Sequence, residues 1–98
     1  MGMELRVLGS SSSGNCYILD NGNEALIIEA GIRFIDVKKA LDFNIRKVVG
    51  CLITHQHNDH AKYAKAMVDC GFHVLALPEV IVSKELKGAR VKANKAGS

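Results

Sequence analysis

Three of the four histidines in this 98-residue chain lie in the segment ITHQHNDHA at residues 53–61. With one aspartate they form the pattern HxHxDH: His55, His57, Asp59 and His60. Neutral imidazole and carboxylate groups suit zinc, and also manganese or iron. Four such groups on one short segment can serve two metal ions, each completed by residues from elsewhere. Buried together without a metal they would lack partners, at a cost of several kcal/mol. The pattern therefore predicts a metal site.

The cluster follows the apolar run VVGCLIT at 48–54, which we interpret as a strand. His55 then lies at a carboxyl end of a strand, where open α/β sheets place their ligand sites. Alternation along extended backbone puts His55 and His57 on the same side. Asp59 and His60 follow as the chain turns into the next helix. We interpret the fourth histidine, His73, as a surface or satisfied core residue.

The elements expected around the cluster alternate between strands and helices. Asn21-Gly22-Asn23 tolerates positive φ and predicts a hairpin, whereas the glycine-serine run at 9–14 is expected to break any regular element. Strands are expected at 4–8, 15–20, 24–29, 48–54 and 73–77, and helices at 33–43, 61–70 and 78–86. The order β-β-β-α-β-α-β-α predicts an α/β (α+β) fold: a mixed sheet with helices packed on it. The strand at 48–54 is expected to be covered on both faces.

Composition fits one small globular domain, with 48% hydrophobic residues and a net charge of +3. The three cysteines, Cys16, Cys51 and Cys70, form no CxxC pair and are interpreted as small buried hydrophobes in a reducing compartment. No apolar run is long enough for a membrane span, so we expect a cytoplasmic protein with no membrane partner. The carboxyl end is basic and can attract phosphates, although such ends are more often only solvated: Lys84, Lys87, Arg90, Lys92 and Lys95.

The motif THQHNDHA resembles the signature of the metallo-β-lactamase superfamily of metallohydrolases, and the likeness extends over residues 4–77. GSSSSGNCYIL at 9–19 resembles the opening of the YycJ/WalJ-like subgroup, which is implicated in DNA processing. The resemblance implies two divalent metal ions, zinc in the first place, with manganese or iron as alternatives. By position, His55 and His57 would ligate one metal, and Asp59 and His60 the other. Asp59 would also orient the attacking water as the catalytic residue.

Further roles follow from the same resemblance. Gly9, Ser10 and Gly14 would line the mouth through which substrate approaches, although a flexible serine turn is an equal alternative. Glu29 stands where the family usually has aspartate and would support the metal loop from behind the ligands. A surface carboxylate at a strand end is the alternative for Glu29.

The family's αββα sandwich has two similar halves, and its remaining metal ligands come from the second half. After His60 the chain has only His73 and Asp69 among histidines and aspartates, neither in a ligand motif. Residues 1–98 therefore resemble a single partial domain, the amino-terminal half of the sandwich. For the complete protein we expect phosphodiester hydrolysis on nucleic acid, with thioester or β-lactam hydrolysis as the alternative enzyme. A truncated, non-catalytic half-domain that binds metal weakly or self-associates is the non-enzymatic alternative.

Overall fold

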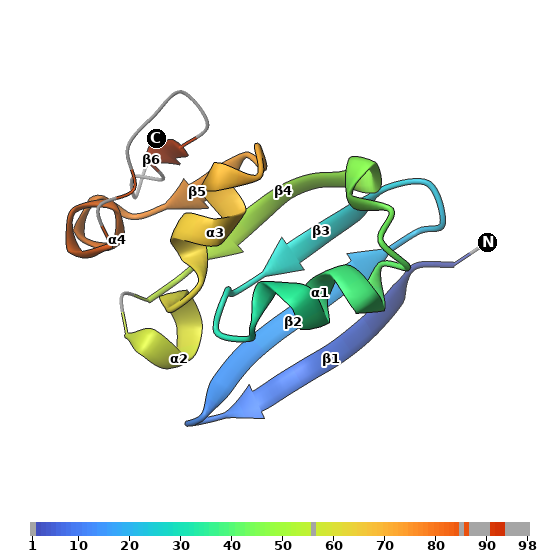
Figure 1. Cartoon of the computed structure of the whole chain (residues 1–98), viewed down its shortest axis with the longest axis horizontal. Helices are drawn as coiled ribbons and strands as arrows, with labels where there is room; N and C mark the ends of the chain where they lie inside the picture. The colour runs from blue at the N-terminus through green and yellow to red at the C-terminus, as the bar shows by residue number, and fades with distance from the viewer. Residues whose placement is uncertain (1, 56, 85, 87–90, 94–98) are drawn as a thin grey trace.

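The computed structural model describes residues 2–55, 57–84, 86 and 91–93. A single six-stranded sheet runs in the order β1-β2-β3-β4-β5-β6, with the helices packed on it (Figure 1). The strands are β1 (Glu4–Ser11), β2 (Gly14–Asp20), β3 (Ala25–Ile28), β4 (Val48–Ile53), β5 (Val74–Ala76) and β6 (Val91–Ala93). The helices are α1 (Phe34–Ala40), the 3-10 turn η1 (Ile45–Lys47), α2 (Asn58–Ala61), α3 (Ala64–Asp69) and α4 (Pro78–Ser83). The mixed α/β fold class predicted from the sequence is confirmed.

The first three strands are antiparallel neighbours joined by two hairpins. The hairpin predicted around Asn21-Gly22-Asn23 is confirmed, with Gly22 at a φ of 97°. The expected break over residues 9–14 is wrong, because β1 continues through Ser11 and pairs it with Gly14 of β2. Only Ser12 and Ser13 form the turn. A register shift between Val7 and Gly9 marks a bulge, which lets the small residues stay in the ladder.

Strands β3 to β6 are parallel and advance in one direction across the sheet. Because crossovers between parallel strands are almost always right-handed, such an order carries every connecting helix over the same face. Figure 1 shows α1 on the viewer's side of β2 and β3. The helix expected at 61–70 is divided into α2 and α3, since Tyr63 N–H donates to the carbonyl of Ala30 at 2.8 Å instead of continuing the helix. Strand β6 lies in the weakly patterned end and was not predicted.

The core lies between the sheet and these helices. One row of paired strand residues, Ile18, Ile27, Cys51 and Val74, is fully buried against them. The helices contribute Val37, Met67 and Val80 to the same cluster. We call the opposite side of the sheet the outer face; it carries the paired rows Val7–Tyr17–Ile28–Leu52–Leu75 and Leu5–Leu19–Leu26. Strand β4 is therefore not covered on both faces as predicted, and Val49 is half exposed.

The carboxylate of Asp20 at the end of β2 is held by two cations and a backbone amide. Lys47 Nζ lies 2.8 Å and Arg6 Nη2 3.8 Å from its Oδ2, and Gly22 N–H donates to Oδ1 at 2.8 Å. The hydrogen bond from Lys47, followed by the one from Gly22, lowers the pKa of Asp20 below its ordinary value. A lowered folded-state pKa contributes stability above the unfolded-state pKa of about 3.9, and this contribution is lost as the pH falls through the folded-state value.

We therefore expect Asp20→Asn to be less stable than wild type at pH 7, with the difference shrinking as the pH falls below about 4. Urea unfolding followed by circular dichroism between pH 3 and 7 measures this difference. Asp69→Asn, at an exposed position, is the control and should track wild type. A difference between wild type and Asp20→Asn that stays constant down to pH 3 would contradict the assignment.

No helix in the part of the chain that the structure describes is long and apolar enough to cross a membrane. Of the basic residues at the carboxyl end, Lys87, Arg90 and Lys95 lie outside the described residues.

Candidate metal centre

The site is built at the carboxyl ends of two parallel neighbours, β3 and β4. Ile28 pairs with Leu52, so the residues that follow each strand, Glu29 and the segment from Thr54, leave the sheet at the same edge. Glu29 N–H donates to the carbonyl of Leu52 at 2.7 Å and keeps the two chains together beyond the last ladder pair. The strand-end position predicted for His55 is confirmed.

Glu29 is a buried carboxylate with two contacts to Thr54. Its side chain points under the histidine segment, and the residue is 4% exposed. Thr54 N–H donates to Oε1 at 3.0 Å, and the Thr54 hydroxyl contacts Oε2. A φ of 68° puts Glu29 in the left-handed region, which is uncommon for a non-glycine residue. The alternative of a surface carboxylate is thereby wrong.

Glu29, His55 and His60 each bring a ligand atom to one place. These three atoms lie within 4.8 Å of one another, and the His55 and His60 ring centroids are 4.7 Å apart. Nδ1 of His60 is buried and lacks a hydrogen-bond partner among the described residues, although Glu29 Oε2 lies 3.3 Å away. Buried polar atoms without partners are rare in proteins. The donor set of two imidazoles and one carboxylate fits a divalent cation, and Glu29 Oε2 is the polar group that His60 Nδ1 faces.

Asp59 and His60 are spaced as two ligands of one ion would be. Asp59 Oδ2 lies 3.5 Å from His60 Nε2. Two ligands at about 2.0–2.1 Å from a tetrahedral zinc lie about 3.3 Å apart. Asn15 Nδ2 donates to both the carbonyl and Oδ2 of Asp59, at 3.0 and 3.2 Å, and so orients this carboxylate from β2.

His57 lies beside this group rather than in it. It is exposed, has extended backbone angles and occupies the N-cap of α2. His55 and His57 both line an open pocket of about 190 Å³, together with Thr54, Glu79 and Val80. The two histidines therefore share the pocket, as their alternation predicts, while His55 alone also reaches Glu29 and His60.

The segment that carries Asp59 and His60 is docked against the chain that follows β3. Ala30 N–H donates to the carbonyl of His60 at 2.6 Å. Gly31 N–H donates to the carbonyl of Asn15 at 2.9 Å, which closes the β2 side. A Cβ added to Gly31 would lie 2.1 Å from the carbonyl oxygen of Asp59. Glycine at 31 is thus required for this close approach.

The three residues predicted to line the substrate mouth lie at the end of the β1–β2 hairpin. A Cβ on Gly9 or Gly14 would approach the other strand or residues 31–32 at 2.7 Å or less, so both glycines serve close packing. Ser10 is exposed and its hydroxyl accepts a hydrogen bond from Tyr17 at 3.2 Å. The pocket at His55 and His57 does not include any of the three among its described lining residues. Their role at a substrate mouth stays a prediction.

Two cysteines lie beneath the site. Cys16 and Cys51 are free, fully buried thiols, as predicted, whereas Cys70 is partly exposed. Burial, with a smaller contribution from the negative charge of Glu29, raises the pKa of Cys16 to about 12 and raises the pKa of Cys51 as well. Neither thiol belongs to the described group of candidate ligand atoms, which are nitrogen and oxygen.

Sequence reasoning missed two residues of this site, Asn15 and Thr54. Asn15 is a 9% exposed amide beside the buried Cys16, and a buried amide needs hydrogen-bond partners. Thr54 was included in the apolar run before the motif, where nothing in the pattern separates it from Ile53.

A mixed sheet with imidazole and carboxylate groups beyond the ends of two parallel strands defines an α/β protein with a candidate metal site. Residues 10–69, more than half of the chain, match the sequence profile of the Metallo-beta-lactamase superfamily, and the chain belongs to it. Members of this superfamily are hydrolases that use divalent metals, and the resemblance predicted from HxHxDH is confirmed.

Among curated proteins the chain is similar to two bacterial exodeoxyribonucleases. It is 35% identical over 65 residues to exodeoxyribonuclease YycJ of Bacillus anthracis, covering 63% of this chain and 25% of that protein. It is 33% identical over 63 residues to exodeoxyribonuclease WalJ of Streptococcus pneumoniae (strain ATCC BAA-255 / R6), covering 61% and 23%. These matches agree with the predicted YycJ/WalJ-like resemblance. The matched region spans about a quarter of each relative's length.

Solved structures with the same fold support the architecture. The metallo-beta-lactamase fold protein YhfI from Bacillus subtilis superposes with a TM-score of 0.68 at 15% identity, over 96% of this chain and 45% of that one. DIM-1 metallo-beta-lactamase superposes with a TM-score of 0.63 at 15% identity, over 96% and 54%. At such identities the likeness establishes the fold alone. The chain spans about half the length of these structures.

Proposed function

We propose that this chain forms the amino-terminal part of a two-metal hydrolase that cleaves phosphodiester bonds in nucleic acid, in the manner of an exonuclease. The observation that carries the proposal is the convergence of His55, His60 and Asp59 around the buried Glu29, with His57 lining the adjoining pocket. The similarity to two exodeoxyribonucleases supports nucleic acid as the substrate.

Each residue of the motif has one task in this proposal. His55 and His57 hold one ion, and Asp59 and His60 hold the other; zinc is the first candidate, with manganese or iron as alternatives. A bound pair of divalent ions supplies Lewis acidity and an activated water for in-line displacement at phosphorus. The chain's own contribution is orientation: Asn15 fixes the Asp59 carboxylate, which accepts a hydrogen bond from the attacking water and directs it. Remaining ligands come from outside residues 1–98.

A nuclease assay tests the proposal. The assay uses a protein that carries this chain together with the ligands proposed to lie outside residues 1–98. With added Mn²⁺ it should release nucleotides from end-labelled DNA, and Asp59→Ala should lower the rate by at least about 100-fold, the usual effect of removing a group that directs proton transfer. Asp69→Ala, an exposed aspartate at the end of α3, is the matched control and should retain wild-type activity. A thioester and a β-lactam are assayed in parallel. Hydrolysis of either of these with DNA left intact would contradict the nuclease assignment.

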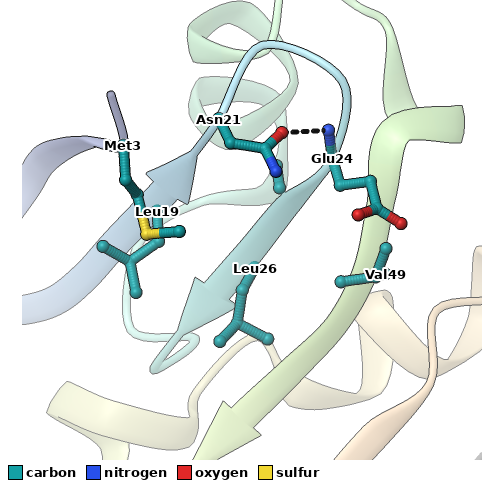
Figure 2. A pocket seen from close by; sticks show the side chains of 7 residues that line it. Met3, Leu19, Asn21, Glu24, Leu26 and Val49 are labelled. Atoms are coloured by element: carbon teal, nitrogen blue, oxygen red, sulfur yellow. Dashed lines mark hydrogen bonds between the residues drawn. The ribbon is translucent and has the colours of Figure 1, made fainter. Parts of the chain in front are cut away.

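A second candidate, a non-catalytic half-domain that self-associates, is favoured by the outer face. Leu5 and Val7 are each 57% exposed and Leu75 is 37% exposed, although all three belong to the sheet. An apolar pocket of about 170 Å³ on this side is lined by Met3, Leu19, Leu26 and Val49, together with Asn21, Glu24 and Ala25 (Figure 2). Contiguous apolar surface of this kind is typical of an interface. In this candidate a second copy of the chain covers the outer face.

We expect Val7→Lys to weaken self-association of the 98-residue chain by at least about tenfold, because a desolvated lysine at the interface costs more than about 1.4 kcal/mol. Sedimentation velocity over a concentration series measures the change. Val82→Lys is the matched control, since Val82 is 78% exposed on α4 and lies off the outer face. Equal effects of the two lysines, or a wild-type chain that stays monomeric throughout, would exclude the outer face as the interface.

A further inference from the structure

Thr54 connects the buried carboxylate to the first histidine of the motif. Its hydroxyl contacts Glu29 Oε2 on one side and lies 2.7 Å from His55 Nδ1 on the other. A threonine hydroxyl has a single proton to donate, and an ionised carboxylate only accepts. The proton of Thr54 is therefore directed to Glu29, and the hydroxyl oxygen is left as the acceptor for His55.

We propose that Thr54 is a positioning residue that sets the tautomer of His55: the Thr54 hydroxyl donates to Glu29 and accepts from Nδ1–H of His55, so Nε2 keeps its lone pair for a metal. We call the chain of contacts Glu29–Thr54–His55 the relay. Free histidine in water prefers the opposite tautomer, with the proton on Nε2, so the relay reverses the intrinsic preference of the imidazole ring. The inference rests on the proposed function for the identity of the ligand, but the tautomer itself is a property of the metal-free chain.

The same carboxylate faces the second histidine of the cluster. Glu29 Oε2 lies 3.3 Å from His60 Nδ1, while His60 Nε2 is turned toward Asp59 Oδ2 at 3.5 Å. Nδ1 of each histidine thus faces the Glu29–Thr54 pair, and Nε2 of His60 lies on the side of the proposed ligand Asp59. The Glu29 carboxylate thus orients the rings of both His55 and His60, which the proposed function assigns to different ions.

The backbone explains how a single glutamate reaches both rings. The left-handed conformation of Glu29 turns its side chain under the segment after β4. Thr54 N–H occupies Oε1 at 3.0 Å, which leaves Oε2 for the Thr54 hydroxyl and His60. Groups that orient metal ligands in this way change metal affinity by about 10–100-fold when they are removed. The relay should therefore be visible in metal binding as well as in the tautomer.

The test is the histidine long-range ¹H–¹⁵N spectrum of the ¹⁵N-labelled, metal-free chain above about pH 8, where imidazoles are neutral. His55 is identified by its disappearance in His55→Ala. We expect Nδ1 of His55 to be the protonated nitrogen in wild type and in Thr54→Ser, which keeps the hydroxyl. In Thr54→Val, which deletes the hydroxyl but keeps the backbone bond to Glu29, the proton should move toward Nε2. His73, which begins the β5 segment away from this network, is the internal reference.

Zinc affinity, measured by competition with a chelating dye, supplies the second readout. Thr54→Val should bind zinc about 10–100-fold more weakly than wild type, and Thr54→Ser within a few-fold of it. An Nε2–H tautomer of His55 in the folded wild-type chain would overturn the inference without any variant. Unchanged tautomer and affinity in Thr54→Val would overturn it too. Both results are independent of hydrolysis, so they separate failure of the relay from failure of the proposed nuclease function.

Discussion

Gly31→Ala is expected to destabilise the fold by about 3 kcal/mol and to abolish metal binding at the motif. The added methyl group would lie 2.1 Å from the Asp59 carbonyl oxygen, 2.6 Å from its carbonyl carbon and 2.7 Å from Asn15 N. All three atoms belong to the backbone, so no side chain can turn away. Either the Asp59–His60 segment leaves residues 29–31, or β2 moves.

Gly31→Ala should reduce metal affinity by more than it reduces the stability of the fold. The bond from Ala30 N–H to the His60 carbonyl and the bonds from Asn15 to Asp59 span the contact that Gly31 permits. Moving the segment by about 1 Å separates His60 from Glu29 and Asp59 from Asn15, and binding sites tolerate only about 0.5 Å of such displacement.

Thermal unfolding and zinc competition measure the two effects. A loss of about 3 kcal/mol corresponds to a fall in Tm of roughly 12–24 °C for a chain of this size. Gly50→Ala is the matched control, because its methyl group would meet only the His73 carbonyl at 3.4 Å and Leu26 Cδ1 at 3.7 Å. A Gly31→Ala variant whose Tm and zinc affinity match those of Gly50→Ala would contradict the docking of the segment.

His60→Ala is the second change with a large expected effect, a loss of more than about 100-fold in zinc affinity. Removing a group that only supports a ligand costs about 10–100-fold, and a ligand itself should cost more. His60 is also the residue that links Glu29 with Asp59, through Nδ1 at 3.3 Å and Nε2 at 3.5 Å. The protein should stay folded, because the ring is about a quarter exposed and the main-chain bond from Ala30 is retained.

The control for this prediction is His73→Ala. His73 is exposed and follows the turn after α3, outside the described metal group. It should leave zinc affinity within a few-fold of wild type. Isothermal titration after removal of adventitious metal distinguishes the two variants. Equal affinities of the two alanine variants would remove His60 from the metal site.

Much of the fold was predictable from local patterns, and the misses share a cause. The hairpin at Asn21–Asn23, strands β4 and β5 and helix α1 all follow from turn residues and apolar spacing. The expected break at 9–14 failed because cross-strand pairing of Ser11 with Gly14 supplied backbone bonds that serine and glycine do not favour on their own. The helix at 61–70 was divided because Tyr63 N–H donates a hydrogen bond to the carbonyl of Ala30, more than thirty positions away in the sequence.

The sequence by itself determined the chemistry: HxHxDH at a strand end predicts a metal site because imidazoles and a carboxylate at that spacing have few other uses. Tertiary structure alone decided how those groups are supported. Glu29, Asn15 and Thr54 converge on the motif through parallel pairing of β3 with β4 and the packing of the β1–β2 hairpin. These contacts join residues 25 to 44 positions apart in the sequence. A local sequence pattern cannot predict a contact between residues so far apart along the chain.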